Sequence, residues 1–127
     1  MTAPVLVTVL NDTTRAHMEM NFFVPPKQAK LIPKPSREDV KITNLPYVCV
    51  YVYSYGGWQM GLNKGFWKKV QILKGALKKA GLTGTIDSEA GVWFAGYDSP
   101  WRLLNRHNEV MVVKKGSAYR PSVRNIL

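Results

Sequence analysis

The sequence has few of the residues on which enzyme and metal chemistry depend. It contains one cysteine, Cys49, and two histidines, His17 and His107, which lie far apart in the chain. A single thiol forms no internal disulfide, and none of the spacings typical of metal sites, nucleophile elbows or phosphate-binding loops is present. We therefore expect a non-enzymatic protein with no catalytic residues and no metal site.

Acidic residues are also scarce. The chain has 18 Lys and Arg residues against 8 Asp and Glu residues, which gives a formal net charge of +10. The excess is concentrated in residues 58–81, with six lysines and no acid, and in residues 114–127, with four basic residues and no acid. Such a surface favours phosphates, carboxylates or an acidic membrane as partners. Nucleic acid is the least favoured anion, because no RRM, KH or helix-turn-helix pattern occurs.

Long apolar runs and targeting signals are absent too. No stretch of about 18 apolar residues occurs, so we expect no membrane span. The first ten residues lack the basic start of a signal peptide, and a lone cysteine favours a reducing compartment. We therefore predict a cytoplasmic protein. Its 127 residues, 46% of them hydrophobic, suffice for one domain with a core.

The pattern of apolar residues predicts an α+β fold in which one long amphipathic helix covers a mainly antiparallel sheet. Stretches that alternate between apolar and polar residues, or that are rich in β-branched residues, indicate strands. Four prolines make residues 25–37 a loop. The expected strands cover residues 4–10, 17–24, 38–43, 46–55, 90–97 and 108–115. In the second of these, one half-buried face is expected to hold Met18, Met20, Phe22 and Val24.

Residues 58–82 are predicted to form the helix, with Gly81 as its C-cap. One apolar stripe recurs at steps of three or four residues and comprises Leu62, Phe66, Val70, Leu73, Leu77 and Ala80. The largely opposite side carries Lys64, Lys68, Lys74 and Lys78. The helix has three interpretations: a solvated basic face, an apolar stripe that binds a protein partner, or an anionic-membrane surface helped by Trp58, Phe66 and Trp67.

A turn near the end of the chain carries the most specific motif. Gly96-Tyr97-Asp98-Ser99-Pro100 is followed by the strand that begins Arg106-His107-Asn108-Glu109. Together with MTAPV at the start and Gly-Gly before the helix, this motif resembles the SOUL/heme-binding protein family, and most closely its SOUL branch. The resemblance covers residues 1–115 and leaves 116–127 as a tail. It implies a distorted antiparallel barrel, here partial because the sequence starts after the family's first strand and first helix.

The resemblance also implies a ligand. Family members bind heme or other tetrapyrroles at an apolar surface pocket, and the matching residues here are Tyr97, Trp101 and Arg102. Trp101 offers stacking area to a flat apolar ring, and Arg102 can hold a carboxylate. Alternatively, the turn is only structural, Trp101 plugs the barrel end and Arg102 is solvated.

Other residues near this motif have competing interpretations. A distant relationship to bacterial effector-binding domains would make Glu109 a ligand contact, whereas a structural pair with Arg106 is the simpler reading. Three residues could serve as soft metal ligands: His107, Cys49 and Met111. We expect each of them to pack against other side chains rather than to coordinate a metal.

The sequence therefore predicts a tetrapyrrole-binding or carrier protein of the SOUL type, with heme as the cofactor. The alternative is an interaction protein whose basic amphipathic helix binds an anionic membrane or a protein partner, and the resemblance adds an association with mitochondria. A sheet without its first strand and helix exposes an edge and an apolar face. We therefore expect a homodimer, or a partner chain that completes the barrel.

Overall fold

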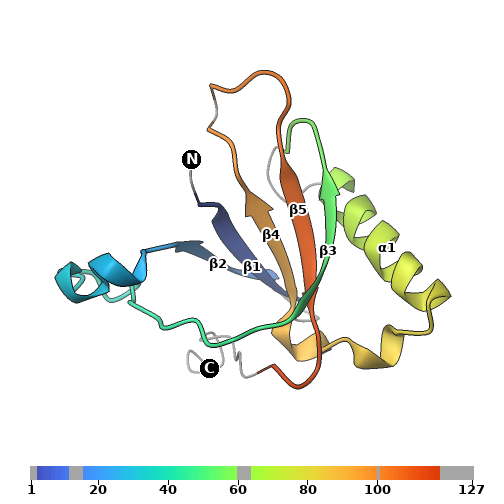
Figure 1. The fold of residues 1–127 in the computed structure, drawn as a ribbon, viewed down its shortest axis with the longest axis horizontal. Coiled ribbons are helices and arrows are strands. Elements are labelled where there is room, and N and C mark those ends of the chain that lie inside the picture. The colour runs from blue at the N-terminus through green and yellow to red at the C-terminus, as the bar shows by residue number, and fades with distance from the viewer. Residues whose placement is uncertain (1–2, 12–15, 60–63, 100, 118–127) are drawn as a thin grey trace.

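A five-stranded antiparallel sheet forms the body of the protein. The computed structural model describes residues 3–11, 16–59, 64–99 and 101–117. The sheet order is β2-β1-β4-β5-β3, and each neighbouring pair is antiparallel (Figure 1). The strands are β1 (Val5–Asn11), β2 (Ala16–Phe22), β3 (Val50–Tyr55), β4 (Val92–Gly96) and β5 (Asn108–Val113). The predicted α+β class is confirmed, and the described strands form an open sheet with β2 and β3 as its edges.

Two strand predictions differ from the structure. Residues 38–43 form a turn and extended chain, because Arg37 pairs with Asp39, the Val40 N–H donates to the Arg37 carbonyl, and no strand lies alongside. The strand predicted for 46–55 begins only at Val50. An apolar alternation alone does not make a strand, because the backbone groups of the segment also need a partner.

The helix α1 (Lys64–Lys79) is shorter than the predicted 58–82. Trp58 is not helical, and the predicted stripe position Leu62 lies outside the described residues. The C-terminal end agrees with the prediction. Gly81 has φ 74°, its N–H donates to the Lys78 carbonyl at 3.1 Å, and the Leu82 N–H donates to the Leu77 carbonyl at 2.8 Å. These two bonds form a Schellman motif, which satisfies carbonyls that the helix end leaves free.

The main core lies between α1 and one face of the sheet. The helix contributes four buried side chains that follow the predicted stripe: Phe66, Val70, Leu73 and Leu77. They pack on strand residues that include Val9, Val92, Val110 and Val112. Val110 and Val112 are fully buried on β5, next to the edge strand that α1 also contacts. The amphipathic helix therefore gains its stability from the sheet beneath it rather than from its propensity, which two glycines weaken.

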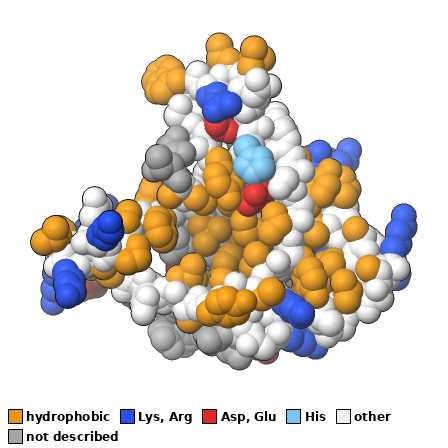
Figure 2. All heavy atoms as spheres, viewed as in Figure 1, with side chains coloured by type: hydrophobic (Ala, Val, Ile, Leu, Met, Phe, Trp, Pro, Cys, Tyr) orange, Lys and Arg blue, Asp and Glu red, His pale blue; other side chains and the backbone are white. Residues whose placement is uncertain are grey.

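A second, smaller core lies on the other face of the sheet. Trp93, Ala90 and Val113 are buried there, and the Trp93 indole N–H donates to the Ala90 carbonyl at 3.2 Å. Viewed as in Figure 1, the molecule shows hydrophobic side chains over the middle of the visible face, below a histidine that lies beside an acidic side chain (Figure 2). The sheet is thus apolar on both faces, and this explains why its central strands read as nearly continuous hydrophobic runs.

The helix leaves part of its own face of the sheet uncovered. Direct pairing of Val7 with Met20 and of Val9 with Met18 puts these β2 side chains on the α1 side. The sequence placed Met18, Met20 and Phe22 on one face correctly. The expected half-burial of that face is wrong, because these side chains are 62%, 63% and 72% exposed. The physical reason is that α1 contacts β3 and β5, which lie toward the opposite edge of the sheet from β2.

Candidate ligand-binding loop

The loop from Tyr97 to His107, which joins β4 to β5, is held by its own hydrogen bonds. Its two ends meet where the Tyr97 N–H donates to the His107 carbonyl at 3.4 Å. The Asp98 carboxylate accepts the His107 N–H at 2.5 Å, and this bond is the main reason that the pKa of Asp98 lies below its ordinary value. The positive charges of Arg102 and Arg106 lower that pKa further. Asp98 is therefore an ionised anchor that ties the start of the loop to its end.

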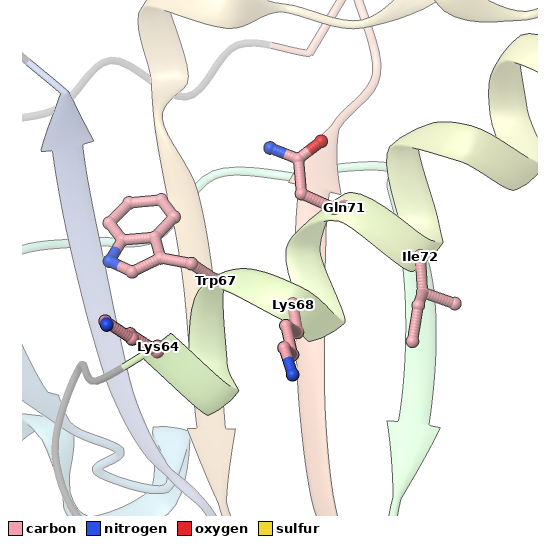
Figure 3. Close-up of a pocket in the computed structure, with 5 residues that line it drawn as sticks. All are labelled: Lys64, Trp67, Lys68, Gln71 and Ile72. Carbon is pink, nitrogen blue, oxygen red and sulfur yellow. The ribbon is translucent and has the colours of Figure 1, made fainter.

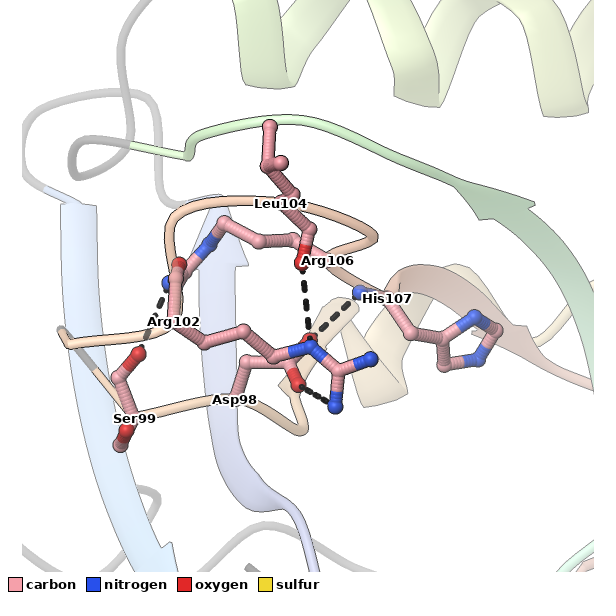
Figure 4. A network of polar contacts seen from close by, with 6 residues as sticks. All are labelled: Asp98, Ser99, Arg102, Leu104, Arg106 and His107. Atoms are coloured by element: carbon pink, nitrogen blue, oxygen red, sulfur yellow. Dashed lines mark hydrogen bonds and ion pairs between the residues drawn. The ribbon is translucent and has the colours of Figure 1, made fainter.

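Two arginines complete this network (Figure 4). Arg106 donates through Nη1 to the carbonyls of Ser99 and Arg102 at 2.8 and 2.7 Å. Arg102 pairs with Asp98 at 3.3 Å and donates through Nε to the Leu104 carbonyl at 3.1 Å. A guanidinium nitrogen that binds two carbonyls holds both in place, because the planar group fixes the directions of its N–H donors.

Arg106 also connects the loop to the segment before α1. Its guanidinium lies 4.2 Å from the centre of the Trp58 ring, which is a cation–π contact. Sequence reasoning placed Trp58 in the helix and read Asp98 only as a turn residue. The sequence did contain one signal of the Asp98 network, namely an acid followed by two basic residues within one loop. Nothing in the sequence points to Trp58 as a neighbour of these residues.

The outer side of the loop carries apolar side chains in solvent. Trp101 is 88% exposed, and Leu103 and Leu104 are exposed as well. The interpretation in which Trp101 plugs the end of the barrel is therefore wrong. The Arg102 side chain is 54% exposed, so part of its guanidinium faces water in spite of the Asp98 contact. The loop thus has three exposed apolar side chains and one partly exposed guanidinium.

Tyr97 and Glu109, both predicted as ligand contacts, lie in contact with each other. The Tyr97 hydroxyl donates to Glu109 Oε2 at 2.8 Å, and His107 Nε2 lies 2.9 Å from Glu109 Oε1. The Tyr97 and His107 rings meet edge to face at 4.8 Å. Burial raises the pKa of Tyr97 to about 12, and the hydrogen bond to Glu109 and its negative charge add to this. Glu109 thus holds both rings, and its polar partners differ from the Arg106 pair considered from the sequence.

The remaining soft-ligand candidates do not gather into a metal site. In the described parts of the chain, no group of three His, Cys, Asp or Glu side chains is placed to hold a metal ion. Cys49 is exposed, and Met111 packs against the second core. Among these candidates, His107 is the one with a carboxylate on a ring nitrogen, since its Nε2 lies 2.9 Å from Glu109 Oε1.

The four lysines predicted as a binding face lie on α1 and are all exposed. Lys64 and Lys68 border a shallow depression of about 530 Å³ on the helix surface, together with Trp67, Gln71 and Ile72 (Figure 3). Lys74 and Lys78 do not line it. No helix in the described ranges is long and apolar enough to cross a membrane. A role of this face in binding an anionic membrane or a protein stays a prediction.

The fold and the loop together describe a small α+β domain whose β4–β5 loop carries exposed apolar side chains and a cation. Comparison with known proteins gives the family. A family model described as SOUL heme-binding protein matches residues 1–113, so the chain belongs to the SOUL heme-binding protein family. The family resemblance drawn from the turn motif is thereby confirmed.

Two curated relatives agree with this assignment. Heme-binding protein 2 of Mus musculus is 30% identical over 128 residues, which are 98% of this chain and 58% of the relative. Heme-binding protein 2 of Homo sapiens is 29% identical over 118 residues, which are 91% of this chain and 55% of the relative. The chain thus spans a little over half the length of these relatives.

Proposed function

We propose that this protein binds heme or a related tetrapyrrole as a carrier rather than as an enzyme, with the loop 97–107 as one wall of the site. The proposal depends on one observation: a single hydrogen-bonded loop carries Trp101, Leu103 and Leu104 exposed to solvent, together with the partly exposed guanidinium of Arg102. Membership of a heme-binding family supports the class of ligand.

The residues of the loop match what a tetrapyrrole requires. Such a ligand is a wide flat apolar ring with carboxylates along one edge, so it needs an apolar wall and cations at the rim. Trp101 supplies the area for stacking and the two leucines extend it. Arg102 supplies the cation, and its contact with Asp98 at 3.3 Å occupies one side of the guanidinium and orients the other. Bound heme would bring its iron to the site.

Two further residues act as positioning groups in this proposal. Asp98 orients Arg102 and holds the loop closed through the His107 N–H. Arg106 fixes the Ser99 and Arg102 carbonyls, which frame Trp101 in the chain. A prepared loop binds more tightly because less conformational entropy is lost when the ligand docks.

Cytoplasmic location and an association with mitochondria stay predictions.

The test is a titration of the purified protein with hemin, followed by absorbance in the Soret region. We expect a shift that saturates at one equivalent and persists in high salt. One face of an indole is about 100 Å², which corresponds to about 2.5 kcal/mol of apolar burial. Trp101→Ala should therefore weaken binding by roughly 10- to 100-fold. Arg102→Ala should weaken it as well, and Arg102→Lys should restore part of the loss, because a lysine keeps the charge without the fork.

The matched control is Tyr47→Ala. Tyr47 is an aromatic residue that is 87% exposed, nearly the same as Trp101, but it lies in the segment before β3. Its loss should leave hemin binding unchanged. Association that does not saturate, that disappears with salt, or that is equally strong in Trp101→Ala and Tyr47→Ala would contradict the proposal.

A further inference from the structure

The exposed face of β2 is the largest departure of this molecule from an ordinary soluble surface. Met18, Met20 and Phe22 point to the same side as the core residues of β1, and Phe23 is 62% exposed immediately after the strand. β2 is also an edge of the sheet, so it pairs with β1 on one side only. Exposed apolar edge strands are normally covered, because they present both apolar area and free backbone groups.

The segment 23–47, which follows β2, has the same character and is named here the arm. It contains the 3-10 helix η1 (Pro26–Leu31), in which no residue is buried. Among residues 23–47 only Ile32 and Pro35 are even half-buried. Each hydrogen bond that the structure shows for an arm residue, among the described parts of the chain, joins two residues of the arm. Its exposed apolar residues include Leu31, Val40, Ile42, Leu45 and Tyr47.

The pictures show how the arm is placed. In Figure 1 the helix η1 stands away from the sheet at the left, and the chain then runs back beneath the strands to reach β3. In Figure 2 the lobe at the left carries hydrophobic side chains interleaved with Lys and Arg. An apolar segment of this length that leaves its own domain is typical of an arm that packs on another subunit.

The exposed area is sufficient for a stable interface. A large apolar or aromatic side chain that is about two-thirds exposed offers roughly 100–150 Å². The four side chains from Met18 to Phe23 therefore present about 500 Å², and the exposed apolar residues of the arm add a similar amount. A standard interface buries about 800 Å² on each partner, so one copy of this surface reaches that size.

We propose that the β2 face and the arm form the interface of a homodimer, in which each copy covers the β2 face of the other. The occupant is a second copy because every copy brings both halves of the contact, an apolar strand face and an apolar arm, and a twofold axis lets both be used at once. The contact is apolar and not electrostatic, since each chain carries a net charge of +10 and two copies repel.

This charge gives the dimer a diagnostic response to salt. Screening weakens the repulsion between two basic copies, so the homodimer should strengthen as salt is added. An acidic protein or an anionic lipid on the same surface would respond in the opposite way, because salt screens its attraction to the basic residues of the arm.

The test is light scattering with size-exclusion chromatography of the protein without hemin, over a range of concentration and salt. We expect a mass of twice 14.3 kDa that dissociates on dilution and persists in high salt. Met20→Lys and Phe22→Lys should each give the monomer mass. Both side chains are exposed in one copy, so the variants should keep the circular dichroism spectrum of the folded protein.

The control variant is Leu104→Lys, which adds the same charge at an equally exposed apolar residue in the loop 97–107. It should remain a dimer. Leu31→Lys lies in the arm, outside the strand, and tests the same interface if the β2 variants unfold. A wild-type mass of 14.3 kDa under every condition overturns the proposal, and so does a dimer that all three surface variants leave intact. Because hemin is absent, neither outcome depends on the tetrapyrrole proposal.

Discussion

Substitution of Gly91 by alanine tests the packing of β4 on β1 most sharply. Gly91 precedes β4 and has φ 72° and ψ −161°, a conformation that is almost confined to glycine and costs another residue about 1–3 kcal/mol. A Cβ atom at this position would lie 2.3 Å from the carbonyl oxygen of Val9 and 3.0 Å from Leu10 Cδ2. The carbonyl belongs to the backbone of β1 and cannot rotate away, so β1 must move relative to β4.

The size of the effect follows from these contacts. Val9 is paired with Val92 at the end of the β1–β4 ladder and is fully buried, so a shift of about 1 Å there breaks hydrogen bonds of the ladder. Each backbone group left buried without a partner costs about 1–3 kcal/mol. With the cost of the positive φ, Gly91→Ala should lower the free energy of unfolding by about 3–5 kcal/mol. The melting temperature should fall by roughly 10–25 °C.

The assay is urea unfolding monitored by tryptophan fluorescence, to which the buried Trp93 contributes. Gly81→Ala is the matched control, because Gly81 has φ 74° but a Cβ there would meet no atom within 4 Å. It should cost only about 1 kcal/mol, the price of the backbone conformation alone. If the two variants lose the same stability, the close approach of β1 to Gly91 is not real and the reasoning is refuted.

Three further predictions concern the core and the loop. Phe66→Ala should cost about 3–5 kcal/mol of unfolding free energy because Phe66 is fully buried, whereas Ile72→Ala on the same helix, half exposed, should cost under about 1 kcal/mol in the same urea assay. The folded-state pKa of Asp98 lies below the ordinary value of about 3.9, so Asp98 stabilises the loop above that pH and this stabilisation is lost as the pH falls through the lowered pKa. The amide proton signal of His107 in an NMR acid titration should show this step, and Asp98→Asn should abolish it. Tyr97→Phe should remove one of the tyrosines that ionise late, near pH 12, from a phenolate absorbance titration.

Each of these has an outcome that would contradict it. Equal losses in the two helix variants would place Phe66 outside the core. An acid step of the His107 amide that survives in Asp98→Asn would belong to another carboxylate. An unchanged alkaline titration in Tyr97→Phe would mean that burial does not hold its pKa high, and Tyr55, whose pKa burial also raises to about 12, remains as the internal reference.

Elements with a strong local signal were predictable from the sequence. The apolar stripe of α1 identified Phe66, Val70, Leu73 and Leu77 correctly, because a helix repeats every 3.6 residues whatever it packs against. Gly81 marked the helix end for the equally local reason that only glycine adopts its positive φ without strain. A strand was also expected within residues 46–55, and in β3 every second residue, Tyr51, Tyr53 and Tyr55, packs on the main core.

The errors fall where a segment needs a distant partner. Residues 38–43 alternate like a strand but have no neighbour to bond with, and the helix starts later than its apolar pattern suggests. Trp58 extends that pattern, yet the structure places it beside Arg106, 48 positions further along the chain. No local pattern contains the information that these two side chains meet.

The candidate site shows the same division. The turn motif led from sequence to Tyr97, Trp101, Arg102 and Glu109, and the structure gathers these residues on one loop and the strand that follows it. That Glu109 holds both Tyr97 and His107 could not be derived, because it depends on how β4 and β5 pair. Pairing register brings residues from separate strands within hydrogen-bond reach, and sequence spacing does not reveal it.

By itself, the sequence determined the fold class, the buried side of the helix, the basic character and the family, since each follows from local periodicity, composition or motif. Only the tertiary structure decided which apolar surfaces stay in solvent. Met18, Met20 and Phe22 have the alternation of a half-buried strand, and they are exposed because the one described long helix packs over β3 and β5, at the far edge of the same face. Alternation in a sequence tells which residues share a face, but burial depends on what lies against that face.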